Sequence, residues 1–176
     1  MKILVIKNRK GIGDTVIFLP YIKALFKKFN SPISLLVKEN SKADQFLFQT
    51  NYIDKILLLE RDKRSNSKHD GFFGSLNLIK DIKKYNFDKI IIFNSSFRFY
   101  LIAKFSAIPE IYQYTLFKKN LQHIFDEHRK FMKDKFNLDI KENPEIQINS
   151  ELVSQSLKKF QINKNELNIL LGIGGS

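Results

Sequence analysis

Short apolar runs alternate with amphipathic segments along this chain, and the alternation predicts its elements. Residues 3–6 are continuously apolar, as is typical of a buried strand, and the segment from Asp14 to Phe29 repeats apolar positions with the period of a helix. The same criteria predict further strands at 33–37, 55–59, 89–93 and 110–114. They predict further helices at 41–49, 73–85, 96–107, 122–136 and 151–160.

Strands that alternate with helices, some of them apolar on both faces, favour an α/β fold with a doubly wound, mainly parallel sheet. Ligands of such sheets bind at the C-terminal ends of the strands. If the first and fourth strands are neighbours, the loops at 7–14 and 94–98 lie together at that edge. The polar segment 60–72 is expected to be a mobile loop.

The end of the chain has the pattern of a new element. Residues 167–171 form an apolar run that predicts a strand, and a loop containing Gly174 and Gly175 follows it. A glycine-rich loop after a strand normally leads into a helix. We therefore expect one domain at 1–162, with 163–176 being a linker and the first strand and loop of a truncated second domain.

The amino-acid composition indicates the size of the core and limits the kinds of site that the chain can form. The chain has 176 residues, 43% of them hydrophobic and 17 of them Phe, which suffices for the core of one domain. It has no Cys, which excludes disulfides, thiolate metal sites and a cysteine nucleophile. The three His, at 69, 123 and 128, lack metal-ligand spacing, so we expect no metal site and no cofactor. Its apolar runs are too short for a signal peptide or a membrane span, so we expect a cytoplasmic protein.

The net charge of +12 results from 30 Lys and Arg against 18 Asp and Glu. Lys residues are spread over every segment, as on a solvated surface, and an AT-rich coding sequence would enrich Lys without any ligand. The charge could also hold the chain against an anionic membrane surface. A nucleic-acid-binding protein is a further alternative, but Arg is scarce and no nucleic-acid-binding motif is found, so we expect no nucleic-acid partner.

Candidate chemistry begins at the glycine loop. The sequence Gly11-Ile12-Gly13-Asp14 lacks the Gly-Lys-Ser/Thr ending of a P-loop, and Val16 stands where a dinucleotide fingerprint needs its third glycine. Asp14 remains, at the start of a predicted helix on the ligand edge of the sheet. It is either an N-cap or a carboxylate that faces a ligand.

Four segments in order resemble glycosyltransferase family 9, the ADP-heptose:lipopolysaccharide heptosyltransferases. Residues 2–25 resemble its first strand, Gly-Asp turn and helix, with Pro20 six residues after Asp14. Residues 87–98 are similar to its strand and loop ending near an Arg. The segment from His123 to Leu138 resembles a His-led helix, and residues 170–176 resemble the strand and loop that open its donor domain.

The resemblance implies a GT-B architecture, in which two Rossmann-like domains face each other across a cleft and this chain is the acceptor half. Asp14 matches the catalytic Asp, the general base that takes a proton from the acceptor hydroxyl. The implied acceptor-binding residues are Lys7, Arg9, Lys10, Gly13, Ser95, Ser96 and Arg98. Gly174 and Gly175 would contact the donor diphosphate, whereas His123 is expected to pack or to cap a helix.

The implied partners are a nucleotide-sugar donor of the ADP-heptose type and an anionic lipopolysaccharide-core acceptor, with a peripheral contact at the inner face of the inner membrane.

Alternative roles stay open for several of these residues and for the chain as a whole. Arg98 can equally be an ordinary surface residue, and the cations of the 7–10 loop can be merely solvated. The whole chain can be a non-catalytic binding module, and as half of an enzyme it is expected to be inactive alone.

Overall fold

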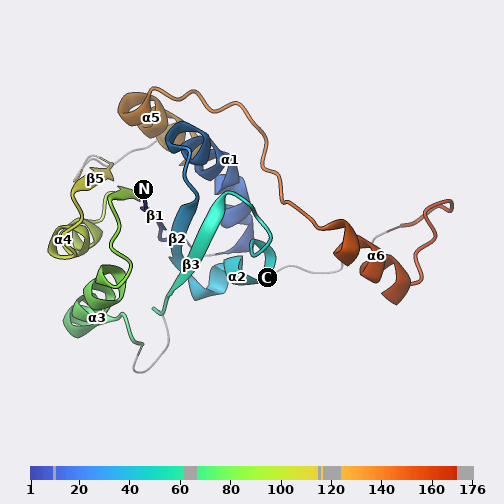
Figure 1. Cartoon of the computed structure of the whole chain (residues 1–176), viewed down its shortest axis with the longest axis horizontal. Helices are drawn as coiled ribbons and strands as arrows, with labels where there is room; N and C mark the ends of the chain where they lie inside the picture. Colours follow the sequence, from blue (N-terminus) through green and yellow to red (C-terminus); the bar gives the residue numbers. More distant parts are fainter. Residues whose placement is uncertain (10, 62–66, 115, 117–123, 170–176) are drawn as a thin grey trace. The chain divides into compact units, whose positions relative to one another are not determined.

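The computed structural model describes residues 1–9, 11–61, 67–114, 116 and 124–169. At its centre is a five-stranded sheet with the order β3-β2-β1-β4-β5 (Figure 1). Each pair of neighbouring strands is parallel. The strands are β1 (Ile3–Lys7), β2 (Ile33–Lys38), β3 (Ile53–Leu59), β4 (Lys89–Ile92) and β5 (Glu110–Gln113).

The central strand β1 is buried along its whole length. Its Val5 pairs with Leu35 on β2 and with Ile91 on β4, so apolar side chains run across the middle of the sheet. Strands that are apolar on both faces need a layer of helices on each face.

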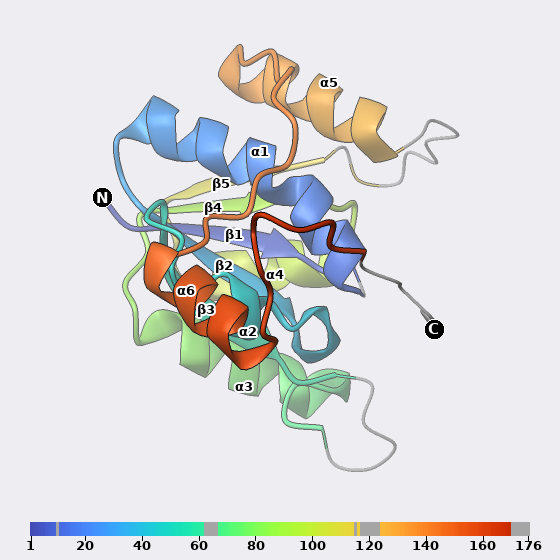
Figure 2. The same ribbon diagram turned by 90° about the vertical axis from the view of Figure 1, so that its right-hand side faces the viewer.

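Those layers come from helices on opposite sides of the sheet. The α-helices between residues 1 and 146 are α1 (Ile12–Phe29), α2 (Ala43–Phe46), α3 (Gly71–Lys83), α4 (Phe97–Phe105) and α5 (Ile124–Phe136). Phe18 of α1 and Phe131 of α5 share one core cluster with Val5. Leu78 of α3 and Phe99 of α4 belong to the cluster on the other face, and Figure 2 shows α1 and α5 above the sheet with α3 below it. The predicted doubly wound α/β fold is confirmed.

The predicted helices differ from the observed ones by one or more residues at their ends, and for two of them the backbone shows the reason. Helix α1 begins at Ile12, two residues before Asp14, because Gly11 turns the chain with a φ of 97°, a conformation that favours glycine. The predicted helix at 41–49 is shorter, since Lys42 adopts the left-handed conformation with a φ of 52°. That residue separates a 3-10 turn, η1 (Glu39–Ser41), from the single turn of α2.

The predicted loop at 60–72 is partly regular. Residues 62–66 lie outside the described part of the chain. On either side of them, the His69 amide donates a hydrogen bond to the Glu60 carbonyl at 3.1 Å, and α3 already begins at Gly71.

The predicted strand at 167–171 is wrong for 167–169, which belong to no strand, and its other two residues lie outside the described part. Leu167 and Ile169 are 89% and 74% exposed, and among the strand pairs of the described residues none includes them.

The chain divides into two compact units, Met1–Ile146 and Gln147–Ser176. The second contains helix α6 (Ser150–Lys159), whose first turn is capped by Asn149, the side chain of which accepts a hydrogen bond from the Glu151 amide at 2.7 Å. No residue of α6 is buried. The functional division into 1–162 and 163–176 stays a prediction.

Candidate functional site

The loops after β1 and β4 meet at one edge of the sheet, as predicted. We call this the carboxyl edge, meaning the C-terminal ends of the strands and the loops that follow them. Strands β1 and β4 are neighbours in register, with Ile6 opposite Ile92, and the Phe93 amide donates to the Ile6 carbonyl at 3.1 Å. The loops that begin at Lys7 and Phe93 therefore leave the sheet side by side.

Asp14 lies in the first turn of α1 at this edge, partly exposed. The N-cap interpretation is wrong, because Gly11 occupies the cap position and Thr15 donates from its hydroxyl to the Gly11 carbonyl at 3.1 Å. None of the hydrogen bonds and ion pairs among the described residues involves the Asp14 carboxylate. An acidic side chain in the first turn is favourable to the helix dipole, and its oxygens are left to accept a proton or a hydrogen bond.

Lys7 supports the start of that helix from below. Its side chain is only 3% exposed, its ammonium donates to the backbone carbonyl of Asp14, and its Nζ lies 5.5 Å from the ring centre of Phe18. Burial, with help from Arg9 and against the attraction of Asp14, lowers the pKa of Lys7 to about 8. The structure thus places Lys7 behind Asp14 as an internal contact, although the sequence assigned it to the acceptor.

The other predicted residues of this loop face outward. Arg9 and Gly13 are exposed, and a side chain at Gly13 would meet nothing within 4 Å. Open space above Gly13 leaves room for a ligand to approach the backbone beside Asp14. Lys10 lies outside the described residues.

The β4–α4 loop is held in shape by two amides that the sequence analysis missed. The Asn94 side chain accepts from the Ser96 amide at 2.9 Å. From the end of β5, the Gln113 side-chain amide donates to the carbonyls of Asn94 at 3.0 Å and Ser96 at 2.9 Å. Ser95 is exposed at the tip of this loop. Only the tertiary pairing of β4 with β5 brings Gln113 here.

Arg98 joins α4 to the start of α3. Its Nε donates to the Ser75 hydroxyl at 2.9 Å and its Nη2 to the His69 carbonyl at 2.5 Å. Burial and the neighbouring Arg61 lower the pKa of Arg98, whereas Asp70 opposes them. Arg98 is therefore anchored within the fold, and it is neither the free cation nor the ordinary surface residue that the sequence suggested.

A ring cluster lies behind Lys7 on the α1–α5 face, and the sequence analysis did not find it. We call it the His128 cluster: Phe18, Tyr21, Phe93, Tyr114 and His128. The centre of the His128 ring lies 5.2 to 5.3 Å from the rings of Phe18, Tyr21 and Phe93, and 6.0 Å from that of Tyr114.

The cluster contains buried polar atoms that find no partner within the described residues. These are Nδ1 of His128 and the hydroxyl of Tyr114. Burial, assisted by the charges of Lys7 and Arg9, lowers the pKa of His128 to about 3, and burial raises the pKa of Tyr114 far above its usual range. Both groups are consequently neutral at physiological pH, so that Lys7 and Arg9 carry the positive charge beside Asp14.

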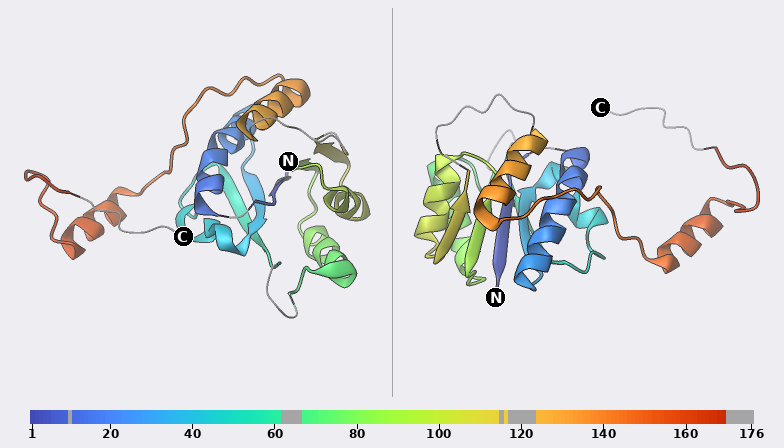
Figure 3. Two further views of the ribbon diagram at one scale, coloured as in Figure 1. Left: turned by 180° about the vertical axis from the view of Figure 1, so that it is seen from behind. Right: turned by 90° about the horizontal axis from the view of Figure 1, so that it is seen from above.

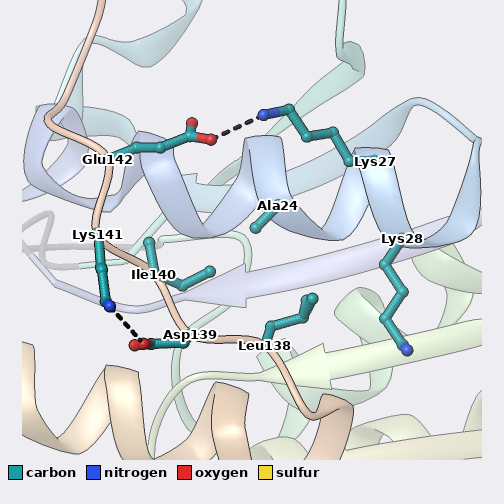
Figure 4. Close-up of a pocket in the computed structure, with 8 residues that line it drawn as sticks. All are labelled: Ala24, Lys27, Lys28, Leu138, Asp139, Ile140, Lys141 and Glu142. Carbon is teal, nitrogen blue, oxygen red and sulfur yellow. Dashed lines mark hydrogen bonds and ion pairs between the residues drawn. The ribbon is translucent and has the colours of Figure 1, made fainter.

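A separate cavity of about 320 Å³ lies away from this edge, between the second half of α1 and the segment that follows α5 (Figure 4). Lys27 and Glu142 pair across its rim at 2.7 Å, and Lys141 pairs with Asp139 at 3.4 Å. Its lining on α1 begins at Ala24, almost three helical turns after Asp14. It is therefore no part of the Asp14 site.

The described residues offer neither a metal centre nor a membrane span. They include no group of three or more His, Cys, Asp or Glu side chains placed to hold a metal ion. Within the same residues, no helix has the length and apolar character that a bilayer crossing needs.

Comparison with known proteins reveals likeness at the level of structure. No family model and no curated protein matches the sequence. The glycosyl transferase family 9 from Veillonella parvula DSM 2008 matches with a TM-score of 0.64 and 17% identity over 94% of this chain and 51% of its own length. The ADP-heptose lps heptosyltransferase II of E. coli matches with a TM-score of 0.62 and 14% identity over 93% of this chain and 52% of its own. The chain shares the fold of these glycosyltransferases.

A third glycosyltransferase has the same relation to the chain. The E. coli heptosyltransferase WaaC, solved with ADP-2-deoxy-2-fluoro heptose, matches with a TM-score of 0.53 and 11% identity over 82% of this chain and 51% of its own. The chain thus spans about half the length of each of these structures. Its five-stranded parallel sheet with helices on both faces is the Rossmann-like arrangement of a GT-B N-terminal domain.

In this glycosyltransferase fold, the described residues bring together part of the predicted site. Asp14, Gly13 and Arg9 gather at the carboxyl edge with the β4–α4 loop, while Lys7 is turned inward. His123, Gly174 and Gly175 lie outside the described residues.

Proposed function

We propose that the chain is the acceptor-binding part of an inverting glycosyltransferase, in which Asp14 is the general base. The donor would be a nucleotide-sugar of the ADP-heptose type and the acceptor an anionic lipopolysaccharide core. The observation that carries the proposal is the Asp14 carboxylate, which has no partner among the described residues and stands at the ligand edge of a glycosyltransferase fold. Three solved structures with this fold are named as glycosyltransferases, which supports the class of reaction.

The proposed chemistry needs a carboxylate in this place. As the acceptor oxygen forms its bond to the anomeric carbon, Asp14 takes the hydroxyl proton. The bond from that carbon to the nucleotide diphosphate breaks on the opposite side, and the diphosphate leaves with the electron pair. Attack opposite to the leaving group inverts the configuration at the anomeric carbon.

The remaining partners follow from charge and exposure. Arg9, with Lys10, Ser95 and Ser96, would bind anionic groups of the acceptor, and Gly13 would let it approach the backbone. Arg98, predicted as an acceptor-binding residue, would instead hold α4 against the start of α3. Lys7 would hold the helical turn that carries Asp14, through its hydrogen bond to the Asp14 backbone carbonyl. Gly174 and Gly175 would contact the donor within a second domain that begins at 163–176. We also infer a peripheral contact with an anionic membrane.

The test is a substitution that keeps the shape of Asp14 and removes its basicity. In a protein that continues this chain through a donor domain, Asp14→Asn should lower the turnover of sugar transfer by about 100-fold or more, because a general base contributes that much. Asp134→Asn is the matched control, since Asp134 is an exposed carboxylate near the end of α5, where Phe136 contacts Phe29 at the far end of α1 from Asp14. Near-normal turnover in a folded Asp14→Asn protein would refute the proposed base.

A further inference from the structure

Large apolar side chains stand exposed on α3 and α4. Phe72 and Phe73 at the start of α3 are 74% and 78% exposed, and Phe105 at the end of α4 is 63% exposed. Leu76 and Phe97 are exposed to 41% and 49%. Phe is among the residues most often found inside proteins, so several exposed on two adjacent helices mark a surface that contacts something apolar.

All of these side chains except Phe73 line a groove between the two helices, which lie side by side in Figures 1 and 3. The groove has a volume of about 580 Å³, within the range of sites that hold small molecules or acyl chains. Its lining is mostly apolar, with Ile79 from α3 and Leu101 and Ile102 from α4. Arg98 bridges the two helices through its hydrogen bonds to Ser75 and His69, which fix their spacing.

The charges around the groove have one sign. Lys83 and Arg98 line it, and Lys80 and Lys104 lie on the same two helices. The single acidic residue of α3 and α4 is Asp81, and it is engaged by Lys68 at 2.6 Å, Lys84 at 2.9 Å and His69 at 3.2 Å. No described acidic side chain pairs with Lys80, Lys83 or Lys104.

We propose that the α3–α4 groove is the surface by which this protein docks on a bilayer that contains anionic lipids. Phe72, Phe73 and Phe105 enter the boundary between headgroups and acyl chains, and Lys83 and Lys104 contact lipid phosphates. Charge complementarity supports this occupant: exposed aromatic rings flanked by unpaired cations match an apolar layer covered by anions. The proposal deepens the membrane contact inferred above and is independent of Asp14, so either can fail alone.

The chain offers a clean fluorescence test because it contains no Trp. Phe72→Trp and Phe105→Trp each introduce a single indole at the groove, and Phe48→Trp is the control, since Phe48 is 64% exposed but lies outside the groove. With vesicles of phosphatidylglycerol and phosphatidylcholine, emission of the two groove indoles should shift to the blue and be quenched by lipids brominated near the headgroup. The Phe48→Trp protein should show neither effect.

Partitioning of the 176-residue chain onto the same vesicles separates the groove from bulk charge. Phe72→Ser combined with Phe73→Ser should weaken binding about tenfold or more, because two exposed rings no longer leave water. Lys83→Gln with Lys104→Gln should weaken it about tenfold. Lys133→Gln with Lys135→Gln, on α5, removes the same charge and should cost about threefold or less.

Three results would overturn the proposal. The groove indoles stay unshifted on anionic vesicles, the α5 pair of substitutions weakens binding as much as the groove pair, or binding to pure phosphatidylcholine equals binding to the anionic mixture. Circular dichroism on each variant confirms that the exposed substitutions leave the fold intact.

Discussion

At the scale of single residues, the two buried basic side chains behind Asp14, Lys7 and His128, differ in their charge. Both residues are almost fully buried, at 3% and 2% exposure, and the charge of Lys7 disfavours a positive charge on His128. Burial lowers the pKa of both residues, but only the pKa of His128 falls below physiological pH, so Lys7 keeps its charge and His128 is neutral. One cation and one neutral ring therefore lie behind the candidate base, so the interior at this place holds a single buried charge.

His128 should make the folded state sensitive to acid. The pKa of His128 is about 3 in the folded state, below its ordinary value of 6.5. Between about pH 3 and pH 6.5, the unfolded chain therefore binds a proton at His128 that the folded chain does not bind. The free energy of unfolding should consequently fall as the pH falls below 6.5, by up to about 1.4 kcal/mol per pH unit. His128→Phe keeps a ring in the cluster and should flatten this decline.

Urea unfolding of both proteins between about pH 4 and 7 measures the effect. The carboxylates of Asp81 and Glu142, whose pKa values are also lowered, contribute equally to both curves and cancel in the difference. Parallel curves for the two proteins would mean that His128 is protonated in the folded state, contrary to its burial.

At the scale of elements, the start of α3 is packed so closely that only glycine fits at one position. A Cβ added to Gly74 would lie 2.2 Å from the carbonyl carbon of His69, and that backbone is held by Arg98. His69 is fixed as well, since its Nδ1 accepts from the Glu60 amide at 3.1 Å and its Nε2 contacts Asp81. The turn before α3, the helix itself and α4 thus form one connected assembly.

Gly74→Ala should therefore destabilise the fold by about 1 to 3 kcal/mol, as overpacking does, because backbone has to move. Gly13→Ala is the matched control, since a Cβ there meets nothing within 4 Å and Ala is a better helix former than Gly. The control should leave stability unchanged or raise it by up to about 1 kcal/mol. The midpoints of urea unfolding measure the change in stability of each variant. Equal midpoints for Gly74→Ala and Gly13→Ala would contradict the close packing at Gly74.

At the scale of the whole molecule, stability is concentrated in the first unit. The strands and helices of Met1–Ile146 hold the buried clusters, whereas α6 in the second unit has no buried residue. Amides protected by a core exchange only when the structure opens, while amides without such protection exchange early.

Hydrogen exchange of the 176-residue chain should accordingly differ between the units. Residues 3–6 and 89–92 should be the most strongly protected, α6 should exchange faster, and 167–169 should exchange fastest, since they belong to no strand. Mass spectrometry of peptides from each segment measures this. Protection of 167–169 comparable to that of β1 would show that this segment pairs as a strand, in line with its apolar pattern.

The sequence by itself determined the five strands of the sheet, the helix layers on its two faces and the edge at which the loops after β1 and β4 meet. Runs such as 3–6 and 89–93 are apolar enough to require burial on both faces, and that requirement leads to a parallel sheet between helices. Because the C-terminal ends of parallel strands share one edge, the order of the elements along the chain is enough to place Asp14 beside the 94–98 loop. The resemblance to family 9 glycosyltransferases is confirmed by the fold as well.

Tertiary structure alone decided the surroundings of these residues. Gly11 rather than Asp14 caps α1, Lys7 turns inward, and His128 from α5 meets Tyr114 from the end of β5. Local sequence carries no signal for such meetings, because burial, ring contacts and pKa values arise from segments that are far apart along the chain. The exposed rings on α3 and α4 follow the same principle: an apolar residue predicts burial, and only the packing of its helix decides whether the chain itself provides the cover.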